Sequence, residues 1–150
     1  MATFTKLDGF VEHLAEKVHN LGSDALTIAL SNTAPGSEST PPTSSTAACV
    51  LANVTQISYT NLSGSRVPTI SSSAQTSGTY KLVLADVTLT ATAAVPTFRY
   101  VYLYNDTPTS PADPLIGYYD YGAGGVTLAT GETFTIDFDG TNGVLTITSP

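Results

Sequence analysis

The stretch RYVYLYNDTPTSPADPLIGYYDYG, residues 99–122, decides the fold that we expect for this chain. Every second residue from Phe98 to Tyr104 is aromatic, and Val101 and Leu103 between them are aliphatic. Because neighbouring side chains of a strand point to opposite faces, both faces of this strand are largely apolar. We therefore expect the central strand of a sandwich, in a chain that is small for covering both faces by itself.

Further strands are expected on both sides of this stretch, with turn residues between them. In residues 79–90 the alternation changes phase between Leu84 and Val87, which predicts a β-bulge near Asp86. Residues 132–148 read as two alternating strands around DGTNG, which predicts a β-hairpin. The expected strands are 24–30, 50–58, 66–71, 79–90, 98–105, 115–121, 125–129, 132–138 and 143–148.

So many short strands predict a mainly β fold, an antiparallel sandwich or barrel with jelly-roll or Greek-key connections, of which we expect the sandwich. Apolar residues at spacings of three and four predict one N-terminal amphipathic helix at about 7–21, ended by Gly22. Residues 31–46 are rich in Pro, Ser and Thr, so they predict a long loop at the surface or against a neighbour. The whole chain, 1–150, is expected to form a single domain.

Charge and composition narrow the expected partners. Charged residues make up 11% of the chain and the net charge is -7, so neither nucleic acid nor an anionic membrane is expected as a partner. The single cysteine, Cys49, excludes an internal disulfide and favours folding in a reducing cytosol. The first 20 residues lack the apolar core of a signal peptide, so we expect synthesis in the cytoplasm.

The sequence offers little for catalysis or for metal binding. His13 and His19 stand six residues apart on the expected helix, about 120° from each other, so we expect two solvent-facing rings and no metal site. Cys49 is expected in the core. Asp137 and Asp139 share one side of a strand, so a paired-carboxylate glycosidase site is one alternative, although solvating groups fit the pattern better. We expect no enzyme activity, no catalytic residue, no metal and no cofactor.

The tyrosines allow three interpretations. They are core and rim residues, or an association surface, or a platform on which sugars stack. The loop between the tyrosine-rich strands, residues 105–114, contains three prolines. Prolines lower the entropy lost when a loop becomes ordered, so this loop suits a fixed contact.

Four stretches carry a family resemblance: FVEHLAEKVHNLGSDALTIALSNTAP at 10–35, GTYKLVLADVTLTA at 78–91, FRYVYLYNDTPTSPADPLIGYYDYG at 98–122 and GETFTIDFDGTNGVLTI at 131–147. They resemble a family of small structural proteins encoded in the virion gene clusters of tailed bacteriophages and prophages. The resemblance implies a β-sandwich or jelly-roll protein that coats or cements the capsid exterior where major capsid subunits meet. The implied partners are the major capsid protein and further copies of the chain, in a trimer or a dimer.

On this hypothesis, the tyrosines and the 105–114 loop make subunit contacts, and the loop at 31–46 or the N-terminal helix reaches the capsid. The alternative is a tail or fibre component whose tyrosines bind host glycans or a receptor. The residues expected at the subunit interface are Tyr102, Tyr104, Pro108, Pro111, Pro114, Tyr118, Tyr119 and Tyr121, and those expected at the capsid are Phe4, Phe10, Pro35, Pro41 and Pro42.

Overall fold

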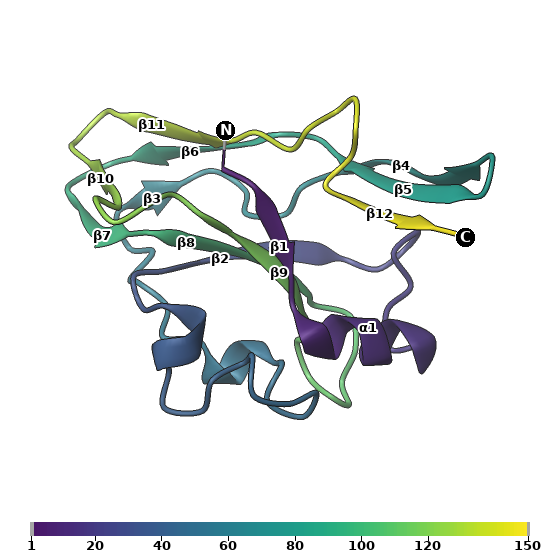
Figure 1. Ribbon diagram of the computed structural model, residues 1–150. Coiled ribbons are helices and arrows are strands. Elements are labelled where there is room, and N and C mark those ends of the chain that lie inside the picture. Colours follow the sequence, from purple (N-terminus) through teal and green to yellow (C-terminus); the bar gives the residue numbers. More distant parts are fainter. Residues whose placement is uncertain (1, 150) are drawn as a thin grey trace.

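The computed structural model describes residues 2–149, and the protein is mainly β, with antiparallel sheets and one N-terminal helix (Figure 1). The helix α1 spans Asp8–Ala15, and two short 3-10 helices span Pro35–Ser37 and Leu51–Asn53. The strands are β1 (Phe4–Lys6), β2 (Leu26–Ser31), β3 (Leu62–Ser63), β4 (Ile70–Thr76), β5 (Thr79–Leu84), β6 (Val87–Ala91), β7 (Val95–Phe98), β8 (Tyr100–Asn105), β9 (Leu115–Asp120), β10 (Val126–Leu128), β11 (Thr133–Ile136) and β12 (Leu145–Thr148).

One layer of the fold consists of three long strands that are each interrupted once. Residues 79–91 supply the middle strand as β5 and β6, with β4 and β3 along one side and β12 and β11 along the other. The second layer is the sheet β1-β9-β8-β2. The strand β7, which precedes β8, pairs with β10, which follows β9. The two layers lie one above the other in Figure 1.

The main core fills the space between these layers. Ile28, Leu103 and Ile116 reach it from one layer, and Leu82, Leu89 and Ile136 reach it from the other. On β6 and β11, buried residues such as Leu89 and Ile136 are separated by more exposed ones, as expected for strands with one face buried. The expectation of an antiparallel, mainly β fold with one N-terminal helix is confirmed, while the sandwich and its jelly-roll or Greek-key type stay predictions.

The predicted hairpin at 132–148 is wrong. β11 pairs with β6 and β12 pairs with β5, so the two segments are halves of one long interrupted strand. The turn residues between them form a local excursion, in which the Asp139 carboxylate accepts hydrogen bonds from the backbone N–H groups of Thr141 and Asn142. Asp and Asn make such local bonds wherever a strand is interrupted, so the DGTNG signal does not distinguish this excursion from a hairpin.

In place of the β-bulge predicted near Asp86, the middle strand is interrupted there, between β5 and β6. The Asp86 carboxylate accepts a hydrogen bond of 2.9 Å from the backbone N–H of Phe138, in the gap between β11 and β12. Leu84 and Val87 are three residues apart and would face opposite sides of an uninterrupted strand. Because Ala85 and Asp86 break the strand between them, both side chains lie in the core. The two outer strands and the middle strand are thus interrupted at matching places.

The helix is shorter than the predicted 7–21. Lys17 has a φ of 66°, in the left-handed region, and its N–H bonds to the carbonyl of Leu14 while that of Val18 bonds to the carbonyl of His13. This pair of bonds is the Schellman motif, which ends a helix. Glycine usually occupies the left-handed position, so the lysine gave no stop signal and the apolar spacing carried the prediction too far.

The early end of α1 also corrects the prediction of two solvent-facing histidines. His13 and His19 are 3% and 5% exposed, and their ring centroids lie 5.8 Å apart. The ring of His19 also lies 5.2 Å from that of Phe10. The 120° separation assumed one continuous helix, whereas the chain turns back after Lys17 and places His19 against the inner side of α1.

Residues 31–57 form the largest irregular part of the chain, and the strand predicted at 50–58 is wrong. Leu51–Asn53 is a 3-10 helix, and single bridges at Val50 and Gln56 replace a strand. The apolar residues at 50–54 do not alternate across a pleat, because they pack onto the central sheet from an irregular backbone. Figure 1 shows this segment below β2 and β8, on the side opposite the other β layer.

Candidate interaction surface

The second face of β8 carries Tyr100, Tyr102 and Tyr104, and the irregular segment 31–57 covers it. These rings form a second core cluster with Leu7, Ala29, Cys49, Val54 and Leu115. Ala34 and Leu51 pack against the same cluster from the covering segment. The chain therefore covers both faces of its central strand with its own residues, which removes the argument that exposed tyrosine surface drives its association.

One buried carboxylate fixes the covering segment. Glu38 is 7% exposed, and its two oxygens accept hydrogen bonds of 2.8 Å from the Thr55 N–H and 2.7 Å from the Thr55 hydroxyl. Hydrogen bonds to a charged group are stronger than those between neutral groups. Glu38 is also the one charged residue between positions 31 and 57, and that isolation in the sequence is a signal that our interpretation missed.

Half of the predicted subunit-interface residues are buried inside the chain. Tyr102, Tyr104, Pro114 and Tyr119 belong to the interior, so this part of the prediction is corrected. Alternation on a strand shows which side chains share a face, but it does not show whether another segment of the same chain covers that face. Tyr119 lies in the main core, where its ring is 6.1 Å from that of Phe138.

The accessible remainder of that prediction is a small patch at the surface of β8 and β9. Tyr118 on β9 and Pro108 and Pro111 in the loop before it are half-buried, whereas Tyr121, also half-buried, packs against the main core on the other side of the sheet. The ring of Tyr118 lies 6.0 Å from that of Tyr100 and 5.7 Å from that of Tyr102, so its inner side is already in contact with the second core cluster. Only its outer side is open to a partner.

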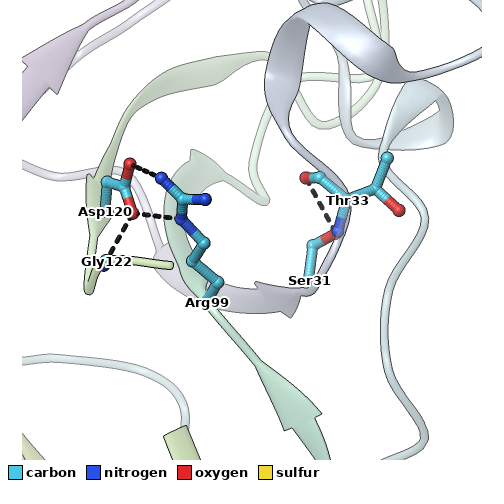
Figure 2. A network of polar contacts seen from close by, with 5 residues as sticks. All are labelled: Ser31, Thr33, Arg99, Asp120 and Gly122. Carbon is cyan, nitrogen blue, oxygen red and sulfur yellow. Dashed lines mark hydrogen bonds and ion pairs between the residues drawn. The ribbon is translucent and has the colours of Figure 1, made fainter. Parts of the chain in front are cut away.

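An ion pair borders this patch. Arg99 donates two hydrogen bonds of 2.6 Å to the carboxylate of Asp120, which also accepts one of 2.8 Å from the N–H of Gly122 (Figure 2). The bond from Arg99 lowers the pKa of Asp120. Both side chains are about a third exposed, so the pair contributes little to folding stability. It does hold a flat guanidinium over the ring of Tyr100, 4.9 Å from its centroid.

The 105–114 loop is held at both ends, as a stiff contact loop would be. The Asp106 N–H bonds to the carbonyl of Ala25, and the Asp113 carbonyl accepts from the N–H of Leu51. The Ser110–Pro111 peptide bond is cis. The loop is thereby joined to the start of β2 and to the covering segment, while its tip around Thr109 and Ala112 is exposed.

The residues expected at the capsid are mostly inside the chain. Phe10, Pro35 and Pro42 are buried, so a partner cannot reach them and this part of the prediction is corrected. Phe10 faces the main core because it lies on the inner side of α1, and the two prolines are buried within the covering segment. Phe4, whose ring lies 5.1 Å from that of Tyr119, and Pro41 are half-buried.

The groups weighed for chemistry have structural surroundings. Burial raises the pKa of the Cys49 thiol to about 11, and this residue is in the core as expected. The hydrogen bonds from Asn142 lower the pKa of Asp139, which opposes a general acid at this position, and Asp137 is exposed. Within residues 2–149, no group of three or more His, Cys, Asp or Glu side chains could hold a metal ion.

Over the same described residues, no helix has both the length and the apolar character needed to cross a bilayer. No protein-family model, no curated protein and no solved structure matches this chain.

Proposed function

We propose that this protein is a non-enzymatic structural component of a tailed-phage virion, a decoration or cement protein bound to the outside of the capsid. The support is the resemblance of the stretches 10–35, 78–91, 98–122 and 131–147 to small virion proteins. These stretches supply α1, β2, the middle strand of one layer, β8 with β9, and the strand formed by β11 and β12. The resemblance therefore covers the framework of the fold and not one exposed motif.

The observation that carries the proposal is the half-buried Tyr118 on β9, with the anchored 105–114 loop at one end of the β8–β9 pair and the Arg99–Asp120 ion pair at the other. A loop that is already fixed by hydrogen bonds to Ala25 and Leu51 loses little entropy when it binds. Tyrosine and arginine are the residue types that most often anchor protein contacts. We place the contact with the capsid at this patch, in place of the buried Phe10, Pro35 and Pro42.

The mechanism is thermodynamic linkage. A protein that binds the assembled shell but not the free capsid subunits lowers the free energy of the shell, and many weakly bound copies add up. A small contact surface is compatible with this role, because each copy needs only a modest affinity.

The test uses virions of the phage or prophage that encodes this chain. We expect the protein on intact capsids, a lower temperature of DNA release after deletion of its gene, and restoration by adding the purified protein. Ala112→Lys at the loop tip should weaken rebinding about tenfold, while Ala129→Lys, at an exposed position directly after β10, should not. Finding the protein only in tails, or equal rebinding by both variants, would contradict the proposal.

The glycan-binding alternative requires open aromatic faces. Among the tyrosines of residues 99–122, only Tyr118 and Tyr121 are partly accessible, and they pack against different cores, so they do not form one stacking platform. Binding to a glycan array that is lost in Tyr118→Ala and in Tyr121→Ala would favour this alternative over the capsid.

A further inference from the structure

The strand β4, Ile70–Thr76, has an unusual position for its length. At seven residues it is the longest strand of the described chain, and it lies at the edge of the sheet β12-β5-β4. It pairs with β5 along one side only. Within residues 2–149, the backbone of 71–76 makes no hydrogen bond outside that pairing, and five of these six residues are exposed. In Figure 1 the β4–β5 hairpin extends away from the rest of the fold.

At two of its other edges, those of β2 and β12, the chain makes contacts of its own. On the outer side of β2, the Ile28 N–H bonds to the carbonyl of Arg66, the Ile28 carbonyl accepts from the Arg66 guanidinium, and the Leu30 carbonyl accepts from the N–H of Ile57. The amine of Lys6 lies 3.4 Å from the carbonyl of Thr146 on β12. Proteins protect edge strands in these ways because open edges pair with other chains.

β4 has none of these protections over its regular part. Pairing with β5 is regular from Ser72 to Thr76, after a register shift that follows Ile70. The sequence VPTISSSAQTSGTY, residues 67–80, contains no charged residue, and its one proline precedes the strand. Gly22 lies close to Ser73, on the face of the sheet, and it leaves the edge itself open.

Charge decides which occupant fits this edge. The chain carries a net charge of -7, so two copies repel each other over most of their surfaces. Residues 67–80 form an uncharged edge, so two copies can approach there without bringing charges of the two strands together. An antiparallel pair of identical edges is also self-complementary, since each strand offers the same alternating N–H and C=O groups about a two-fold axis.

We propose that two copies of this chain pair antiparallel along β4 and join their three-stranded sheets into one continuous sheet. The hydrogen bonds come from the backbone, and the neutral Ser, Ala and Thr side chains allow the close approach. This pairing is a property of the isolated protein, goes beyond attachment to a capsid, and does not depend on the phage role.

Cysteine scanning tests the pairing directly. Cys49 is buried, so it gives little background, and single cysteines are introduced at Ser72, Ser73, Ala74 and Gln75 in turn. Around a two-fold axis, only positions next to the axis face their own copies, so we expect disulfide-linked dimers at one or two neighbouring positions and little at the others. Thr127→Cys, an exposed position on β10, is the control.

Sedimentation equilibrium supplies the second measurement. We expect the unmodified protein to be dimeric and Ala74→Lys to weaken the dimer tenfold or more, because each copy then brings a lysine into the middle of the paired strands. Ala74→Lys reduces the net negative charge, so general repulsion predicts the opposite change. Thr127→Lys makes the same charge change off the edge and should leave the dimer intact. Circular dichroism confirms folding of each variant.

Three results would overturn the proposal. One is a monomer at all concentrations together with no dependence of cross-linking on position. Another is a dimer that Ala74→Lys leaves unchanged, which would locate the contact elsewhere. The third is a monomer whose binding to capsids is abolished by Ala74→Lys, which would assign the edge to a strand of a different protein.

Discussion

The two faces of the sheet β1-β9-β8-β2 are covered in different ways. One face meets the second β layer, where buried side chains such as Leu103 and Ile136 alternate with exposed ones along regular strands. The other face, with Tyr100, Tyr102 and Tyr104, is covered by residues 31–57, whose only regular elements are two three-residue 3-10 helices. The first cover follows a periodic pattern, and the second does not.

This difference shows what holds each cover in place. Regular strands bury apolar area in proportion to their length, so the first face depends mainly on the hydrophobic effect. The covering segment is fixed by individual polar bonds, including those of Glu38 to Thr55 and that of the Asn53 side chain to the carbonyl of Ala48. The first face should therefore respond most to lost volume, and the second to lost hydrogen bonds.

The largest effect is expected from Leu103→Ala on the face between the layers. Leu103 is 1% exposed, and truncating such a residue leaves a cavity that costs about 3 to 5 kcal/mol of unfolding free energy. Leu51→Ala, in the half-buried covering segment, should cost about 1 kcal/mol. Urea unfolding of both variants measures this difference. Equal losses would mean that the two covers have the same physical basis.

The next effect is the response to acid at the helix, which joins the two faces through Phe10 and Leu7. Burial, with a smaller contribution from His13, lowers the pKa of His19 to about 4 despite the opposing charge of Asp24. The unfolded chain then binds the proton more readily than the folded one. Stability is therefore complete above about pH 6.5, falls as the pH drops to about 4, and changes by roughly 3 kcal/mol in that window.

Denaturant unfolding between pH 7 and pH 4 measures this loss, and His19→Gln is the matched variant. The glutamine cannot take up a proton, so its stability should depend less on pH even if it is lower throughout. A wild-type protein and a variant with parallel pH curves would show that carboxylates, and not His19, cause the acid sensitivity.

The periodic patterns in the sequence predicted the regular strands and their buried faces, but not the strand pairing or the irregular segments. β8 and β9 and the inward residues Leu82, Leu84, Val87 and Leu89 were predictable because alternation on a strand reports the buried face directly. The partner of each strand was not, because β11 and β12 carry the local signals of a hairpin while their pairing depends on the distant middle strand.

The candidate site was predicted less well than the fold. Tyr102 is buried because the segment after Ser31 folds back over it. His13 lies beside His19 because the chain folds back onto the helix after Lys17. No pattern in the sequence encodes such a return. The isolated Glu38 and the uncharged stretch 67–80 were visible, and they acquire meaning only when the fold shows one buried and the other at an open edge.

A smaller effect is expected from Glu38→Gln, which tests whether single bonds hold the second cover. The amide replaces one acceptor oxygen by a donor that faces Thr55, so about 2 kcal/mol of local stability should be lost. Hydrogen exchange should rise within 31–57 and remain slow in β5 and β6. Glu132→Gln is the control, because this exposed carboxylate accepts one bond, from the Ala129 N–H. Uniform exchange changes across both layers would refute separate covers.

The smallest effect, and one of opposite sign, is expected from Tyr102→Phe. The Tyr102 hydroxyl is buried and has no hydrogen-bond partner among residues 2–149, so its removal should be neutral or should stabilise the protein by up to about 1 kcal/mol. Tyr59→Phe makes the same chemical change where the hydroxyl accepts from the Leu30 N–H at 2.9 Å and donates to Gln56 at 2.8 Å. That variant should lose about 1 to 2 kcal/mol. Thermal unfolding of the two variants compares the loss of a buried hydroxyl that has no partner with the loss of one that makes two hydrogen bonds. Destabilisation of both would mean that water reaches the second face and bonds to the Tyr102 hydroxyl.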